Sequence, residues 1–81
     1  MTDPTVDVHL FAAARAAVGT SVLSVAPGRL SAILDGIEAD HPAFADVRPR
    51  CSCLVDGTSV HDDIEVEGGS RIDVLPPFAG G

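Results

Sequence analysis

The sequence predicts an α+β fold in which a sheet of about five strands is covered by one main helix. The helix is indicated by apolar side chains at helical spacing within residues 30–37, and it should stop at His41, because Pro42 disfavours helical angles in the residue before it. The strands are indicated by apolar and polar residues that alternate in residues 5–10 and again in residues 72–74. The apolar face of such a sheet is the surface that the helix needs to cover.

The N-terminal strands are predicted to form a hairpin. Residues 5–10 form its first strand and residues 21–26 its second. Between them, the alanine-rich residues 12–18 favour a helical turn or a short helix. Gly19 can end that helix, because glycine readily adopts left-handed backbone angles.

The segment after the main helix is predicted to contain a second hairpin. Residues 43–50 are expected to be irregular or to form a short turn of helix, and a strand should follow over residues 51–55. Asp56-Gly57 is a typical two-residue hairpin signal, and residues 58–60 should return as a short strand. The acidic residues 61–67 are expected to be a loop.

The last predicted strand leads into a C-terminal tail. The turn at residues 68–70 precedes this strand, and Pro76-Pro77 ends it, because proline cannot donate a hydrogen bond within a sheet. The predicted division is therefore a folded domain over residues 1–75 and a flexible tail over residues 76–81 that ends in Gly-Gly.

The composition favours a soluble cytoplasmic protein that works with other proteins. The 81 residues suit one domain, and no apolar run approaches the roughly 18 residues of a membrane span. With 12 acidic and 5 basic residues, the net charge is −7. This charge would repel nucleic acids and anionic membranes, so we expect neither as a partner. Proteins with basic surfaces are the partners that it favours.

The two cysteines are predicted to be inert thiols in a reducing compartment. Cys51 and Cys53 would point to one face of a strand about 6.6 Å apart along it, which is poor geometry for a disulfide. A zinc site needs about four ligands with characteristic spacing. Because His9, His41 and His61 are scattered through different segments, no metal site is expected.

The end of the chain has a composition unlike an ordinary terminus. Termini are often polar and flexible, whereas this tail has no polar side chain. Prolines hold a segment extended and lower the entropy lost when it is bound, and glycines fit a narrow channel. These features suit a tail that enters the active site of another protein. Its residues are Leu75, Pro76, Pro77, Phe78, Ala79, Gly80 and Gly81.

The reactive group of such a tail would be the carboxylate of Gly81. A carboxylate is a poor electrophile, because its negative charge repels nucleophiles. Attack on the α-phosphate of ATP would activate it as an acyl-adenylate, and a sulfur donor that replaces AMP would leave a terminal thiocarboxylate. The chain would then be a co-substrate, and its sequence contains no recognisable catalytic triad or acid/base pair.

The sequence resembles the MoaD/ThiS family of ubiquitin-like sulfur carriers, and within that family the small subunits of molybdopterin synthase. Residues 8–15, with Gly19 after them, look like the first strand and turn of the family. Residues 54–58 look like its hairpin, and residues 66–72 like the approach to its last strand. The most specific match is residues 75–81.

The resemblance implies a β-grasp fold, in which a mixed sheet wraps one helix and the last strand is central. It implies that a ubiquitin-activating-type adenylyltransferase (MoaB/MoeB/ThiF-like) uses ATP to adenylate Gly81, and that a sulfurtransferase supplies sulfur. The domain itself would bind no cofactor. A large synthase subunit (MoaE-like) would receive the tail, in a heterotetramer, and the thiocarboxylate would give sulfur to cyclic pyranopterin monophosphate.

The resemblance also implies an apolar docking patch on the exposed sheet face. Phe11 and Leu75 match positions in this patch, and Arg15 matches a family position that can contact a partner. A core position for Phe11 and a purely structural role for Arg15 remain open. Ser59 stands where the family often has an apolar residue, so the patch is expected to be weaker or shifted on that side.

Three other functions remain open at this point. The chain could carry sulfur for thiamin thiazole or cysteine synthesis. It could be a protein modifier that joins Gly81 to lysines of target proteins, although its five basic residues are all arginines, so it cannot form lysine-linked chains of itself. It could also be a binding module that never uses its carboxylate.

Overall fold

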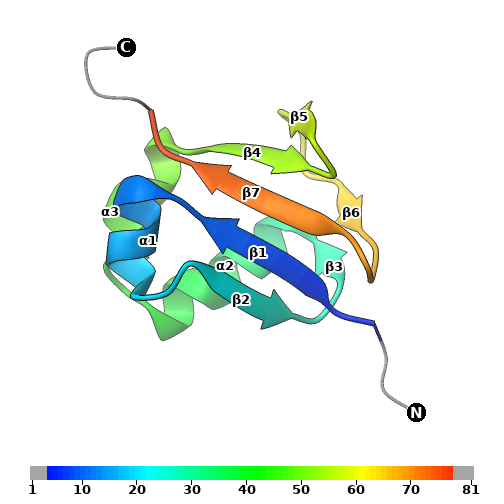
Figure 1. Cartoon of the computed structure of the whole chain (residues 1–81), viewed down its shortest axis with the longest axis horizontal. Coiled ribbons are helices and arrows are strands. Elements are labelled where there is room, and N and C mark those ends of the chain that lie inside the picture. The colour runs from blue at the N-terminus through cyan, green and yellow to red at the C-terminus, as the bar shows by residue number, and fades with distance from the viewer. Residues whose placement is uncertain (1–3, 78–81) are drawn as a thin grey trace.

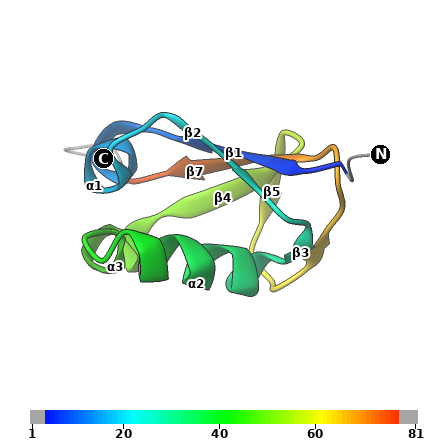
Figure 2. The same cartoon turned by 90° about the horizontal axis from the view of Figure 1, so that it is seen from below.

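A computed structural model describes residues 4–77 of the chain, and these form a sheet packed on one side against a long helix (Figures 1 and 2). The strands are β1 (Val6–Leu10), β2 (Val22–Val25), β3 (Gly28–Arg29), β4 (Ser52–Val55), β5 (Thr58–Val60), β6 (Glu65–Val66) and β7 (Arg71–Leu75). The helical segments are α1 (Ala12–Val18), α2 (Leu30–Asp40), α3 (Phe44–Val47) and the 3₁₀ turn η1 (Arg48–Arg50).

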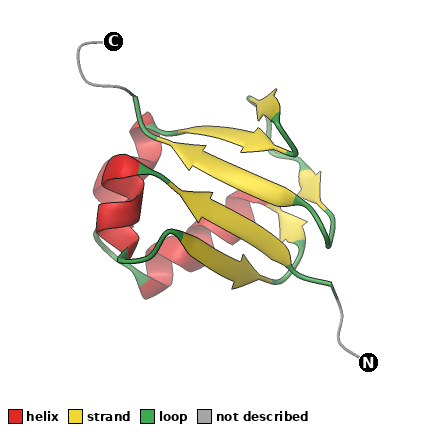
Figure 3. Ribbon diagram, in the orientation of Figure 1, coloured by secondary structure: helices red, strands yellow, loops and turns green. Residues whose placement is uncertain are grey.

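The last long strand lies in the middle of the main sheet. The order of the five strands is β2-β1-β7-β4-β5, as the yellow arrows in Figure 3 show. Strand β7 pairs parallel with β1 and antiparallel with β4, so the sheet is mixed. With one main helix against it, this is the predicted β-grasp fold. The C-terminal tail therefore starts from the centre of the sheet.

The first hairpin forms as the sequence predicts. Strands β1 and β2 pair antiparallel, and α1 occupies the connection between them. Gly19 ends α1 in the left-handed conformation, with φ of 88°, and its N–H donates to the carbonyl of Arg15 at 2.8 Å. The second predicted hairpin joins β4 and β5 through Asp56 and Gly57, which both have positive φ.

The core lies between the sheet and α2. Alternate residues of β1 and β7 point into it, and the apolar stripe of α2 covers them. The prediction of a helix over an apolar sheet face is confirmed. The buried apolar residues are Val6, Val8, Leu10, Ala14, Val18, Leu30, Ile33, Ile37, Phe44, Cys53, Val66, Ile72 and Val74.

Tertiary packing decides the structure of two short segments, of which the first matches the helical alternative of the prediction and the second does not. Residues 43–50, expected to be irregular or a helical turn, form α3 and η1, because a helical turn here buries Phe44 completely. The prediction of a loop over the acidic residues 61–67 was wrong at residues 65–66, which form β6 and pair with β3. Val66, only 2% exposed, draws this part of the loop onto the core.

The loop before β6 also caps the first turn of α2. The backbone N–H and the hydroxyl of Ser31 donate to the two carboxylate oxygens of Asp63, at 2.9 and 2.7 Å. The N–H of Leu30 donates to the carbonyl of Ile64 at 2.8 Å. These contacts satisfy helix N–H groups that have no partner within the helix. They also hold the pKa of Asp63 below its usual range, mainly through the backbone N–H of Ser31.

Replacing Asp63 by alanine is expected to lower the free energy of unfolding at neutral pH. Because the pKa of Asp63 is lower in the folded state, the contribution of this residue is present above its unfolded pKa, about 4, and is lost as the pH falls through its folded pKa. Urea titrations at several pH values would measure both effects. Asp62→Ala, which removes the neighbouring exposed carboxylate, is the matched control. Equal urea midpoints for the two variants would contradict the assignment.

Candidate partner-binding site at the root of the C-terminal tail

The described part of the tail is anchored where it leaves the sheet. Strand β7 ends at Leu75, which is half-buried, and Pro76 after it is buried. Pro77 is exposed. The predicted reactive end, which comprises Phe78, Ala79, Gly80 and Gly81, lies outside the described residues. The geometry that can be described is therefore that of the tail root, Leu75 to Pro77.

A small hollow of 180 Å³ lies beside the tail root. It is bounded by Ala13 of α1 and Val47 of α3 on its apolar side, and Pro76 and Pro77 form another wall. Asp46 and Arg50 complete its lining and bring one carboxylate and one guanidinium to the root. Residues of α1, α3 and η1 thus lie beside the tail where it leaves the sheet.

Phe11 lies next to the tail root and does not belong to the core. Its backbone N–H donates to the carbonyl of Val74 at 3.3 Å, which places it beside the end of β7. Its side chain is 39% exposed, so the alternative of a core phenylalanine was wrong. Ala12 after it has φ of 49°, a strained conformation for a residue with a side chain, and this sharp turn leads the chain from β1 into α1.

Arg15 follows Phe11 by one helical turn. Its N–H donates to the carbonyl of Phe11 at 3.4 Å, and residues four apart share one side of a helix. The residue is exposed, and within residues 4–77 its side chain forms no ion pair. The guanidinium is therefore available to a partner. Of the predicted site residues, the structure thus gathers Phe11, Arg15 and Leu75 at one end of the sheet.

The sheet face opposite α2 carries an apolar residue that the sequence analysis missed. The side chain of Leu54 alternates with the buried Cys53, so it points to the outer face, where it is half-buried. It stands opposite Asp73, while Leu75 stands opposite Ser52, which makes the two leucines diagonal neighbours. The alternation within β4 was the available signal. We call Phe11, Leu54 and Leu75 the outer apolar patch.

Ser59 adjoins this patch as expected from the sequence. It pairs with Leu54 across β4 and β5, and its side chain is exposed. On the neighbouring strand β7, the Nε–H of Arg71 donates to the carboxylate of Asp73 at 2.7 Å, so these two charged groups satisfy each other. Leu54 supplies apolar area where Ser59 does not, so the patch extends over β4 and stops at β5.

The described residues carry the outer apolar patch, and the predicted reactive group, the carboxylate of Gly81, lies outside them. Across residues 4–77 there is no cluster of three or more histidine, cysteine or acidic side chains that could hold a metal ion. Cys51 and Cys53 carry free thiols, and the thiol of Cys51 donates to the carbonyl of Val47 at 3.3 Å. Burial raises the pKa of both thiols, which favours their protonated, weakly nucleophilic form.

A β-grasp domain whose central strand ends at an exposed apolar patch, with a Gly-Gly tail after it, defines a ubiquitin-like carrier. The ThiS family model matches residues 8–81, and the chain belongs to this family of ThiS/MoaD ubiquitin-like sulfur carriers. A comparison with curated proteins finds no match. In the segments that the structure describes, no helix is long and apolar enough to cross a membrane.

Solved structures share the fold at low sequence identity. Small archaeal modifier protein 1 from Methanosarcina acetivorans is 22% identical, with a TM-score of 0.84 over 100% of both chains. The protein of the same name from Haloferax volcanii is 20% identical, with a TM-score of 0.82 over 95% of this chain and 99% of that one. In a complex of subunits 1 and 2 of molybdopterin-converting factor from Helicobacter pylori, the matched chain is 17% identical, with a TM-score of 0.72 over 95% and 99%.

Proposed function

We propose that this sulfur carrier serves molybdenum cofactor biosynthesis as the small subunit of molybdopterin synthase. Its Gly81 thiocarboxylate would donate sulfur to cyclic pyranopterin monophosphate. The observation that carries the proposal is the family match, which continues through the tail to Gly81. The anchored root at Pro76 and the outer apolar patch beside it support a tail that is handed to other proteins.

The activation chemistry of Gly81 takes place on a partner enzyme. A carboxylate oxygen of Gly81 attacks the α-phosphorus of ATP, and pyrophosphate leaves to give the acyl-adenylate. Hydrosulfide, which a thiol reductant releases from the persulfide of a sulfurtransferase, then attacks the carbonyl carbon. AMP leaves with the electron pair of its bond, and loss of a proton to solvent leaves the thiocarboxylate. ATP is bound by the adenylyltransferase, and the chain itself holds no cofactor.

The proposed receiver of the loaded tail is a large synthase subunit. The Helicobacter pylori structure contains subunits 1 and 2 of molybdopterin-converting factor as a complex, and the fold of this chain is similar to one of its chains. In the proposal, the outer apolar patch docks on the adenylyltransferase and on the large subunit in turn, and Arg15 at its margin adds a charged contact. A heterotetramer in the cytoplasm is the expected assembly.

Mass spectrometry of the intact chain tests the proposal. Incubation with the cognate adenylyltransferase, ATP and a sulfur donor should replace one oxygen by one sulfur at Gly81, and addition of the large subunit with cyclic pyranopterin monophosphate should return the original mass. An unchanged mass after the first step, with components shown to be active on another carrier, would refute sulfur loading. Loading without discharge would refute only the molybdopterin pathway.

A second candidate function is that of a protein modifier, which the similarity to small archaeal modifier protein 1 favours. Activation of Gly81 would be identical, but the adenylate would end as an amide with a lysine of a target protein. Conjugates of higher mass in cell extracts that disappear when Gly81 is deleted would support this function. A deletion strain distinguishes the remaining functions. Thiamin auxotrophy would indicate a carrier for thiamin thiazole synthesis, and a cysteine defect would indicate a carrier for cysteine synthesis.

Substitution of Leu54 by serine is expected to weaken docking of the adenylyltransferase by about 10- to 100-fold, because central apolar contacts dominate the affinity of interfaces. Leu54 lies on the outer face, so the core should be retained. Isothermal titration calorimetry measures the affinity, and Ala39→Ser on the exposed side of α2 is the control. If both variants bind equally well, Leu54 does not belong to the docking surface.

A further inference from the structure

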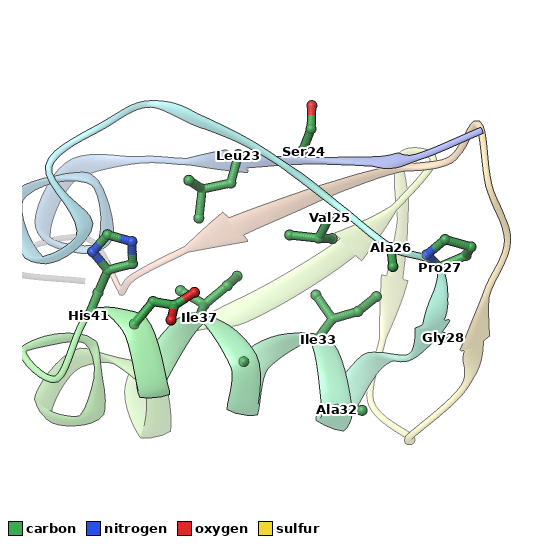
Figure 4. Close-up of a pocket in the computed structure, with 12 residues that line it drawn as sticks. Leu23, Ser24, Val25, Ala26, Pro27, Gly28, Ala32, Ile33, Ile37 and His41 are labelled. Carbon is green, nitrogen blue, oxygen red and sulfur yellow. The ribbon is translucent and has the colours of Figure 1, made fainter. Parts of the chain in front are cut away.

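A cavity of 410 Å³ lies between the edge strand β2 and the helix α2 (Figure 4). The side chains of Leu23 and Val25 point from β2 toward the helix, and Ile33 and Ile37 point from α2 toward the strand. The volume is within the range of small-ligand sites, but the cavity is built along the side of a strand. Its lining is mainly aliphatic.

The backbone of β2 along this cavity is free to accept another strand. Strand β2 is the first in the sheet order and pairs only with β1 among residues 4–77. The N–H of Leu10 donates to the carbonyl of Ser21 at 2.8 Å, and bonded pairs alternate in antiparallel strands. Val22 and Ser24 therefore direct their backbone N–H and C=O groups to the open edge, where the Val22 carbonyl accepts only a 3.4 Å contact from the Thr20 hydroxyl.

On the helix side of the cavity, short side chains leave room for a side chain of a bound segment. Ala32, Gly36 and Asp40 line it at intervals of four residues, which puts them on one side of α2. Gly36 weakens the interior of a helix relative to alanine, and a Cβ built there meets no atom within 4 Å. No packing among residues 4–77 therefore requires glycine at this position, and its missing side chain leaves the groove open.

The charges around this groove indicate what kind of segment it binds. Asp40 lines one end of the cavity beside His41, and none of the lining residues is lysine or arginine. The chain as a whole carries a net charge of −7, which disfavours a second copy as the partner. A segment with a basic residue next to Asp40 is electrostatically complementary.

We propose that the β2–α2 groove binds an extended apolar segment of a partner protein that carries arginine or lysine at one end. The segment adds to the sheet next to β2, through backbone hydrogen bonds to Val22 and Ser24. Its alternate side chains insert between the strand and the helix, and its basic end contacts Asp40. The groove shares no residue with the tail root or the outer apolar patch, so a partner held here would leave both accessible.

A synthetic peptide titrated into the isotopically labelled full chain tests this proposal. The probe is a blocked peptide of about eight residues, enough for one strand, in which valine and threonine alternate and two arginines stand at one end. We expect NMR shifts confined to β2 and the facing side of α2, with slowed amide exchange at Ser24. Peptides with the arginines at either end report the direction of the added strand, and a version with glutamates should bind about tenfold more weakly.

Matched variants separate strand addition from nonspecific binding. Gly36→Leu fills the groove and should reduce affinity at least about tenfold, whereas Ala39→Leu on the same helix should not. Asp40→Asn should weaken only the arginine peptides, and Asp62→Asn should have no effect. A probe with alternate amides N-methylated keeps its side chains and should lose binding.

Four results would overturn the proposal. The N-methylated probe could bind as tightly as the unmodified one, Gly36→Leu could bind the probe as tightly as the unsubstituted chain, the NMR shifts could lie outside the groove, or no probe could bind. Dimerisation of the free chain through β2, seen by sedimentation, would identify a second copy as the occupant and would also overturn it. None of these outcomes depends on sulfur loading at Gly81, so the test is independent of the proposed function.

Discussion

Deletion of Gly81 is expected to abolish sulfur loading and to leave the folded domain intact. The new terminal carboxylate, on Gly80, would stop about 3.5 Å short of its former position, which is enough to remove it from the α-phosphate of a bound ATP. Intact-mass measurement after incubation with the adenylyltransferase, ATP and sulfur donor should show no mass change. Urea unfolding should be unchanged, since the deleted residue lies beyond β7.

Two further variants test whether the position of the terminal carboxylate is the cause. One extra residue after Gly81 should also abolish loading, because the carboxylate would then overshoot the same position. Asp62→Ala, an exposed substitution outside the tail, keeps the tail and its terminal glycines unchanged and should still be loaded. Normal loading of the truncated chain would show that the terminal carboxylate of Gly81 is not the reacting group.

Phe44→Ala is expected to lower the free energy of unfolding by about 3–5 kcal/mol, the cost of removing a fully buried aromatic ring and leaving a cavity. In a domain of this size, that loss is comparable to the whole stability. Urea unfolding followed by circular dichroism would measure it, and a fraction of the variant is expected to be unfolded without denaturant.

A second phenylalanine provides the control for this prediction. Phe11 is 39% exposed, so Phe11→Ala should cost under about 1 kcal/mol while weakening partner docking. The two substitutions remove the same ring with opposite consequences for stability and binding. Similar losses of stability in the two variants would mean that α3 does not contribute to the core in the way the structure indicates.

The long elements were predictable because their sequence periods are unambiguous. Alternation over β1 and the helical spacing of Leu30, Ile33 and Ile37 define which faces are buried. Asp56-Gly57 predicted the second hairpin, because both residues tolerate the positive φ that this turn needs. The parallel pairing of β1 with β7 joins distant segments, and it was expected only from the family resemblance.

The segments around Phe44 and Val66 were less predictable, because tertiary packing decides their structure. Phe44 lies between two alanines and Val66 lies two residues after Ile64, so each stands in an apolar segment too short to establish a period. Each segment becomes a short helix or strand because the fold buries Phe44 or Val66 in the core. Local propensity carries little information over segments of two to four residues.

The chemistry of the site stays a prediction, because Gly80 and Gly81 lie outside the described residues. The Gly-Gly tail stands out in the sequence, since it joins paired prolines to paired glycines and has no polar side chain. Phe11 remained ambiguous because it sits at a turn, where alternation ends. Leu54 was missed because its exposure depends on which face of β4 meets α2, and the resemblance directed attention to Ser59 instead.

The central position of β7 has a mechanical consequence for a protein that is held by its tail. A pull on Pro76 acts along β7, which is paired with β1 on one side and β4 on the other. The hydrogen bonds of both ladders lie across the direction of pull, so they must be sheared together and cannot open one at a time. A force applied to the tail would therefore load both ladders at once, and the domain would resist unravelling from its C-terminal end.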